Sequence, residues 1–167
     1  MLVPRVHTPV PLAGLDNLLD AAHRDVRGFG LSEDAYRLAI AQLKLEHGTD
    51  GAGNLRGVYG YCLGNHDATH ADRANPTIPI FSTVPEHEGN ASSSDTAVHL
   101  RRAYEDAEAG LMGYWAALLD GFPDGYDAIC TGDPAVFAHA LKVAHYYTAD
   151  EASYARGLRA LMPAVEQ

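Results

Sequence analysis

The chain has 167 residues, of which 47% are hydrophobic and 20% charged. This balance is typical of one soluble globular domain, residues 1–167, with a core of its own, and it excludes a disordered or fibrous chain. The formal net charge is −10, which argues against a nucleic-acid partner, because phosphate backbones are bound through clustered Lys and Arg.

Residues 1–13 are expected to form an extended N-terminal arm. The first eleven residues hold three prolines and no continuous apolar core, so this segment is not interpreted as a signal peptide. No apolar run approaches the roughly 20 residues that span a bilayer. We therefore expect no membrane insertion, synthesis in the cytoplasm, and non-classical delivery if the target lies in the periplasm or cell wall.

Apolar residues at helical spacing predict a first helix over 14–27. A second helix is expected to begin after Ser32, a favourable N-cap, and to end before Gly48. Apolar residues surround most of its circumference. This pattern is typical of a helix buried in the middle of a fold.

Residues 48–95 are rich in Gly, Asn, Pro and Ser and are interpreted as a polar lobe against the helical body. Leu55–Leu63 and Ile78–Val84 are expected to be either short strands or irregular loop. Further helices are expected over Thr96–Ala103 and Glu105–Leu119, after Asp133-Pro134, and after Asp150. The predicted fold class is mainly α, within α+β: a helical bundle around a central buried helix with a small polar lobe.

The sequence has two candidate cross-links: a disulfide between its two cysteines and a metal site in a cluster of His and Asp residues. Cys62 and Cys130 match no metal motif, and cytosolic synthesis favours two reduced thiols over a disulfide formed after export. His66, Asp67, His70 and Asp72 include a His-x-x-x-His spacing, which binds zinc on a helix. The flanking Gly, Asn and Pro make a helix doubtful there, so we expect no metal site and no cofactor.

Three segments, in order, carry a resemblance to a known family. They are Ala41-Gln-Leu-Lys-Leu-Glu-His-Gly48, Cys62-Leu-Gly-Asn65, and a C-terminal run with Arg102-Ala-Tyr104, Ala109-Gly110 and His145-Tyr-Tyr-Thr-Ala149 followed by Tyr154. Together they resemble the glucosaminidase-type peptidoglycan hydrolases of the lysozyme-like superfamily over about residues 32–162. The sequence departs from that pattern at His47, where the family has Ser or Thr, at Thr49-Asp50, and at His66.

The resemblance implies a catalytic acid at Glu46. Independently of it, Glu46 follows a buried apolar helix and lies near that helix's negative end. Desolvation and the helix dipole both disfavour the anion, so its pKa should be raised. A carboxyl group that keeps its proton near neutral pH can protonate a glycosidic oxygen.

A second group must stabilise the cationic transition state or position water. Glu86 and Glu88 in the polar lobe are the candidates, with Asp95 as another, and a substrate acetamido group could replace all three. The resemblance also implies sugar-binding roles for Asn65, Tyr104 and Tyr146. A turn asparagine and a packed core tyrosine are the alternative interpretations of Asn65 and Tyr146.

The resemblance implies a glycosidase, a muramidase or N-acetylglucosaminidase, that cuts β-1,4 bonds in peptidoglycan strands. Delivery without a leader would suit an antibacterial effector toxin, whose producer would hold a cognate immunity protein. The departures beside Glu46 motivate a second hypothesis, a non-catalytic lysozyme-like module that binds glycan or protein. The histidines leave a metal-dependent hydrolase as a third.

Overall fold

The computed structural model describes residues 1–64, 67–83 and 99–163. Their helices are α1 (Leu15–Arg27), α2 (Glu33–His47), α3 (His70–Ala74), α4 (Ala107–Gly121), α5 (Pro123–Cys130), α6 (Pro134–Val143) and α7 (Glu151–Leu161). The strands are β1 (Val10–Pro11), β2 (Asn54–Leu55), β3 (Ile80–Ser82) and β4 (Leu100–Arg102). They form two antiparallel pairs, β1 with β2 and β3 with β4. The predicted fold class, mainly α within α+β, is confirmed.

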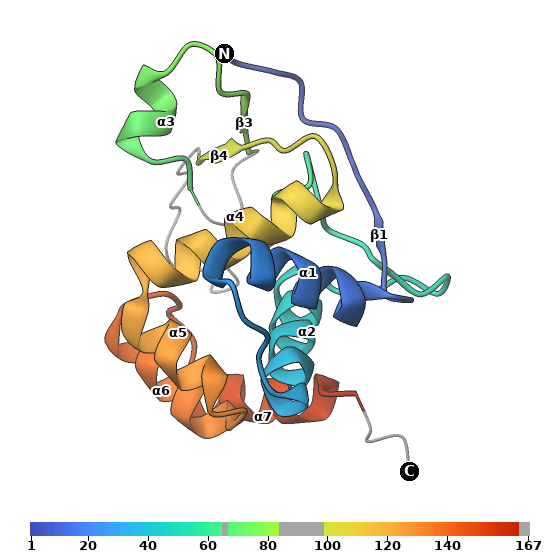
Figure 1. Cartoon of the computed structure of the whole chain (residues 1–167), viewed down its shortest axis with the longest axis vertical. Helices are drawn as coiled ribbons and strands as arrows, with labels where there is room; N and C mark the ends of the chain where they lie inside the picture. Colours follow the sequence, from blue (N-terminus) through green and yellow to red (C-terminus); the bar gives the residue numbers. More distant parts are fainter. Residues whose placement is uncertain (65–66, 84–98, 164–167) are drawn as a thin grey trace, which may run out of the picture.

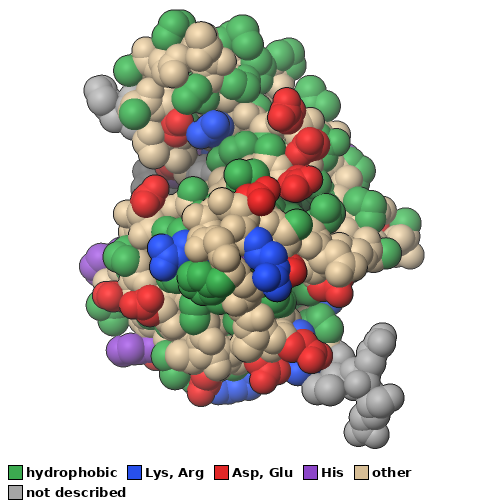
Figure 2. All heavy atoms as spheres, in the orientation of Figure 1, with side chains coloured by type: hydrophobic (Ala, Val, Ile, Leu, Met, Phe, Trp, Pro, Cys, Tyr) green, Lys and Arg blue, Asp and Glu red, His purple; other side chains and the backbone are tan. Residues whose placement is uncertain are grey.

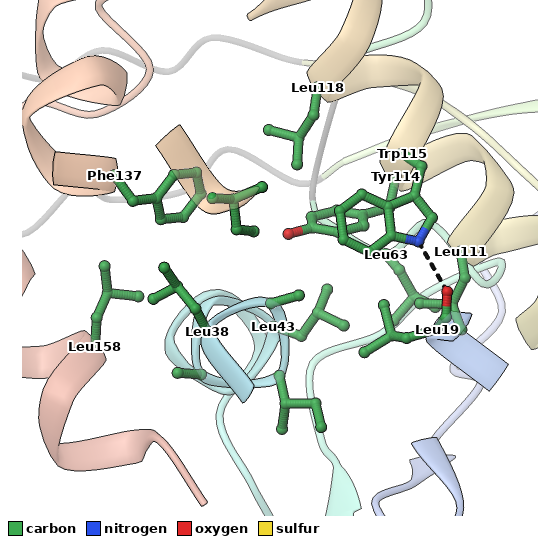
Figure 3. Close-up of a cluster of buried hydrophobic side chains, with 14 of the residues drawn as sticks. Leu19, Leu38, Leu43, Leu63, Leu111, Tyr114, Trp115, Leu118, Phe137 and Leu158 are labelled. Carbon is green, nitrogen blue, oxygen red and sulfur yellow. Dashed lines mark hydrogen bonds between the residues drawn. The ribbon is translucent and has the colours of Figure 1, made fainter. Parts of the chain in front are cut away.

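Helix α2 is the centre of the helical body. Figure 3 shows it end-on, with Leu38 and Leu43 directed into apolar side chains from several other helices. Helix α1 packs against α4, and α2 packs against α7. Trp115 of α4 is fully buried and donates its indole N–H to the Leu19 carbonyl at 3.2 Å, which joins α4 to α1. The central buried helix expected from the apolar pattern is therefore present.

Side-chain caps explain where the predicted helices begin. Ser32, Asp106, Asp133 and Asp150 each accept a hydrogen bond from a backbone N–H in the first turn of α2, α4, α6 and α7. Such a cap satisfies an N–H group that has no partner inside the helix. Helix α5 was not expected, and it begins at Pro123 without a side-chain cap.

In Figure 1, α3, β3 and β4 lie above the helical body, and the N-terminal arm runs from there down its right side to β1. Strand β3 pairs with β4 through Phe81 and Arg101, and the arm lies beside β3, where Leu2 bridges to Ile80. Farther along, β1 pairs with β2. The arm thus contributes backbone hydrogen bonds to both sheets.

Two glycines of α4, Gly110 and Gly113, allow tyrosine-containing segments on either side of the lobe strands to approach the helix closely. A Cβ atom at Gly110 would lie 2.1 Å from the Tyr61 carbonyl oxygen, and one at Gly113 would lie 2.1 Å from the Tyr104 hydroxyl. Both distances are far below any van der Waals contact, so only glycine fits at these two positions.

Two expectations about local structure are wrong, and one open alternative is decided. The helix expected over Thr96–Ala103 is replaced, in its described part, by β4, because pairing with β3 outweighs local helix preference. Of the two alternatives for Leu55–Leu63, the irregular loop is the one observed, because β2 ends at Leu55 and turns follow. No helix was expected at His70, yet α3 begins there, because Thr69 and Asp72 form a capping box.

Acidic side chains are scattered over the face in Figure 2, with a few Lys and Arg between them. Neither Cys62, which is buried, nor Cys130, which is half-buried, is in a disulfide. Among the described residues, no helix is both long and apolar enough to cross a membrane.

Candidate active site

Glu46 is the next-to-last residue of α2 and is half-buried. The Tyr154 hydroxyl, on α7, donates a hydrogen bond to its Oε1 at 3.0 Å. The side chain is therefore held at the helix end and does not extend into bulk solvent. This placement agrees with the prediction from the sequence, while the raised pKa expected for Glu46 stays a prediction.

Glu46 lines a cavity of about 240 Å³ between the end of α2 and the lobe. The other described residues of its wall come from the arm, the loop after β2 and the two strands of the β3–β4 pair. They are Arg5, Gly57, Tyr59, Phe81, Thr83 and Arg101. The described part of the wall thus holds the Glu46 carboxyl group, two arginines, two aromatic rings and the Thr83 hydroxyl.

Buried tyrosines surround the inner side of the Glu46 carboxyl. Tyr154 is 8% exposed, and its ring stacks on Tyr147 with 3.9 Å between centroids. Burial raises the pKa of Tyr154, and the nearby Glu46 charge raises it further. A phenol that keeps its proton this firmly acts as a permanent hydrogen-bond donor to the carboxyl group.

A second tyrosine pair lies behind the first. The Tyr146 hydroxyl donates to the Gly64 carbonyl at 3.0 Å, and the Tyr114 hydroxyl donates to Gln42 Oε1 at 2.6 Å. Burial is the main cause of the raised pKa of both phenols, and the Glu46 charge contributes to both. Tyr146 therefore lies within electrostatic range of Glu46, while its hydroxyl bonds the lobe at Gly64.

His47 joins the C-terminal end of α2 to the lobe. Its ring is 4% exposed; Nε2 accepts from the Gly64 N–H at 3.0 Å, and Nδ1 faces the Gly57 carbonyl at 3.3 Å. Its backbone carbonyl accepts from the Gly57 N–H at 2.8 Å. These bonds fit the neutral ring with the proton on Nδ1. The departure from Ser or Thr at this position thus has a structural role.

The remaining predicted site residues separate into two groups. Tyr104 packs against Gly113 beneath the Arg102 guanidinium and is not among the described residues of the cavity wall. Asn65, Glu86 and Glu88 lie outside the described residues, as do Asp95 and His66. Their predicted roles stay predictions.

The acidic residues considered for a metal site have other partners. Asp67 accepts from the His99 ring at 2.9 Å, and Asp72 caps α3 through Thr69. Within the described ranges, no group of three or more His, Cys, Asp or Glu side chains converges as metal ligands would. Of the described residues that line the cavity, Glu46 alone carries a carboxylate.

Sequence reasoning missed Arg5, Tyr59 and Arg101 as cavity residues. Arg5 belongs to an arm expected only to be extended, and Arg101 to a segment expected to be helical. The arginines come together with Glu46 through pairing between segments far apart in the chain. Only the cation itself, in an otherwise uncharged arm, was a visible signal.

Comparisons with known proteins give one informative result. No protein-family model matches the sequence, and no curated protein matches it. The crystal structure of a peptidoglycan hydrolase mutant from Sphingomonas sp. A1 is similar to this chain with a TM-score of 0.55 and 23% sequence identity. The match covers 90% of this chain and 94% of that chain. At this level of identity the two proteins share a fold.

Proposed function

We propose that this chain is a glycoside hydrolase that cleaves β-1,4 bonds between N-acetylglucosamine and N-acetylmuramic acid in peptidoglycan strands. One observation carries the proposal: the half-buried Glu46 carboxyl lines a cavity and is held there by the Tyr154 hydroxyl. The shared fold with a peptidoglycan hydrolase supports the substrate class.

In the proposed reaction, Glu46 protonates the leaving glycosidic oxygen as the bond to the sugar C1 breaks. Its position beside the last carbonyls of α2 favours the protonated acid. The bond from Tyr154 fixes the carboxyl orientation, and a fixed acid loses less entropy on reaching the transition state.

We propose Glu86 or Glu88 as the second group, which stabilises the oxocarbenium-like state or activates water. Thr83 lines the cavity, and these residues follow it by three and five positions in the sequence. Asp95 and the substrate's own acetamido group are the alternatives. Separate Glu86→Gln, Glu88→Gln and Asp95→Asn variants distinguish them, because an acetamido mechanism leaves all three active.

The test of the main proposal is turbidity loss of purified cell wall. Glu46→Gln should abolish the activity, while Glu33→Gln, at the exposed opposite end of α2, should retain it. Equal activity of wild type and Glu46→Gln would refute the assignment. Mass spectrometry of the released muropeptides then reports which of the two amino sugars carries the new reducing end.

A non-catalytic glycan-binding module is the second candidate. The observation that favours it is the departure beside Glu46, where His47 replaces the family's Ser or Thr and is bonded to the Gly64 N–H. Retention of the chain on insoluble wall without release of reducing sugars would support it. Sedimentation with wall and appearance of reducing ends, measured in one assay, separate the two functions.

The biological setting we propose is that of an exported antibacterial effector with a cognate inhibitor in the producer. The support is chemical, since peptidoglycan lies outside the cytoplasmic membrane. Expression with an added periplasmic leader should lyse a bacterial host, whereas expression without that leader or of Glu46→Gln should not. Equal growth of all three cultures would contradict the proposal.

A further inference from the structure

Backbone hydrogen bonds before and after Arg5 in the sequence hold this part of the arm at the cavity wall. The Val3 N–H donates to the Ile80 carbonyl at 2.8 Å, and the Gly60 N–H donates to the Val6 carbonyl at 2.9 Å. The arm therefore enters the cavity region as a fixed segment between β3 and the loop after β2. The position of the Arg5 side chain follows from this double attachment.

The guanidinium of Arg5 lies over the Tyr59 ring, 3.7 Å from its centroid. Both residues line the cavity with Glu46. The Arg5 Nε atom is buried, and no group within the described residues bonds to it. Stacking on an aromatic ring fixes the plane of a guanidinium and leaves its N–H edge for a ligand, and that edge matches a carboxylate through two parallel hydrogen bonds.

Arg101 brings a second positive charge to the same cavity from β4, and it is 9% exposed. The described wall thus holds two cations and one carboxyl group, in a chain whose net charge is −10. Positive side chains at this part of the wall favour an anionic group of the substrate.

We propose that Arg5, stacked on Tyr59, forms a subsite that binds a carboxylate of the glycan substrate beside Glu46. This inference rests on the proposed function and makes it more specific: the enzyme would select strands that bear muramic acid over neutral polymers of N-acetylglucosamine. The carboxylate has two sources, the lactyl group of muramic acid in peptide-free strands and the acidic groups of the stem peptide in intact strands. Both present the same planar anion to the guanidinium.

The test compares three substrates at equal amino-sugar concentration: peptide-free glycan strands, strands with stem peptides, and chitin hexasaccharide. Arg5→Gln should lower kcat/KM about 10- to 100-fold on a carboxylate-bearing substrate, the range expected for a lost hydrogen bond to a charged group. It should leave kcat/KM on the hexasaccharide within about twofold. Loss on peptide-free strands identifies the lactyl group, and loss only on strands with peptides identifies the stem.

Arg56→Gln is the matched control, because Arg56 is exposed and does not line the described cavity. It removes the same charge and should change none of the three rates by more than about twofold, because exposed charges are largely screened. Arg5→Lys keeps the charge without the planar fork and should recover part of the rate. Equal loss on all three substrates after Arg5→Gln, or no loss on any, would overturn the proposal.

Failure of the proposed function gives a different result. If the wild type cleaves none of the substrates, the hydrolase proposal fails, and the subsite is then tested by binding to Glu46→Gln with peptide-free strands. Binding that is lost on adding Arg5→Gln, and kept on adding Arg56→Gln, supports the carboxylate subsite without catalysis. Equal binding by both double variants refutes it.

Discussion

Tyr154→Phe removes a single oxygen atom and should change the pH dependence of the proposed hydrolase. The hydroxyl donates to Glu46 Oε1 at 3.0 Å and belongs to a side chain that is 8% exposed. A hydrogen bond to a charged group contributes about 1.5–3 kcal/mol. We take about 1.5 kcal/mol, the lower end, because the Glu46 side chain is half-buried and water screens part of the interaction.

The sign follows from the direction of the bond. A donated hydrogen bond favours the carboxylate, so its removal favours the protonated acid. Since the protonated acid is the active form, activity is lost as pH rises, and that basic limb should move upward in Tyr154→Phe. At 1.36 kcal/mol per pKa unit, about 1.5 kcal/mol moves the limb by about one pH unit.

The assay is initial-rate hydrolysis of peptide-free glycan strands from pH 4 to 9, with kcat and KM separated. Tyr147→Phe is the matched control, since Tyr147 stacks on Tyr154 but donates its hydroxyl to the Ala138 carbonyl at 2.9 Å. That variant should lose stability without moving the limb. A basic limb that stays in place or moves downward in Tyr154→Phe would refute the reasoning.

Three further predictions concern stability, each measured by urea unfolding. Gly110→Ala should lower the free energy of unfolding by about 2 kcal/mol or more, because its Cβ would meet the Tyr61 carbonyl oxygen; Gly121→Ala, in open space on the same helix, should have little effect. His145→Gly should raise it by about 0.5–1 kcal/mol, because His145 has φ 56°, a left-handed conformation that glycine adopts without strain; a lower stability than wild type would contradict this. His23 is fully buried, and burial lowers its pKa below 6.5 despite the hydrogen bond to the Phe29 carbonyl. Its contribution to stability is therefore complete above pH 6.5 and is lost as pH falls below it. His23→Gln should weaken the dependence of the free energy of unfolding on pH below 6.5. An unchanged dependence would exclude His23 as its source.

Local signals in the sequence were sufficient to predict the helical body. The apolar pattern and the Ser32 cap predicted α2, and the Asp133-Pro134 pair predicted the start of α6. Glu46 could be placed because its position depends only on where α2 ends. Helix α5 escaped prediction because it has neither a side-chain cap nor enough length for a clear apolar pattern.

The lobe could not be predicted in the same way, because its structure depends on partners distant in sequence. The segment around Arg101 has a locally helical pattern, yet it pairs with Phe81 in β3. Arg5 reaches the cavity only because the arm is bonded to Ile80 and Gly60. No local pattern in the sequence predicts such pairings, so sequence reasoning did not place Arg5 and Arg101 at the candidate site.

The bonds of His47 have a mechanical consequence. Since this residue directly follows Glu46 and is bonded to Gly57 and Gly64, any displacement of those loops pulls on the final turn of α2 itself. Glu46 and the part of the cavity wall that Gly57 forms are therefore constrained to move together. If the proposed function holds, binding of a glycan strand would have to displace another part of the cavity wall. The distance between Glu46 and the Gly57 segment would then stay unchanged on binding.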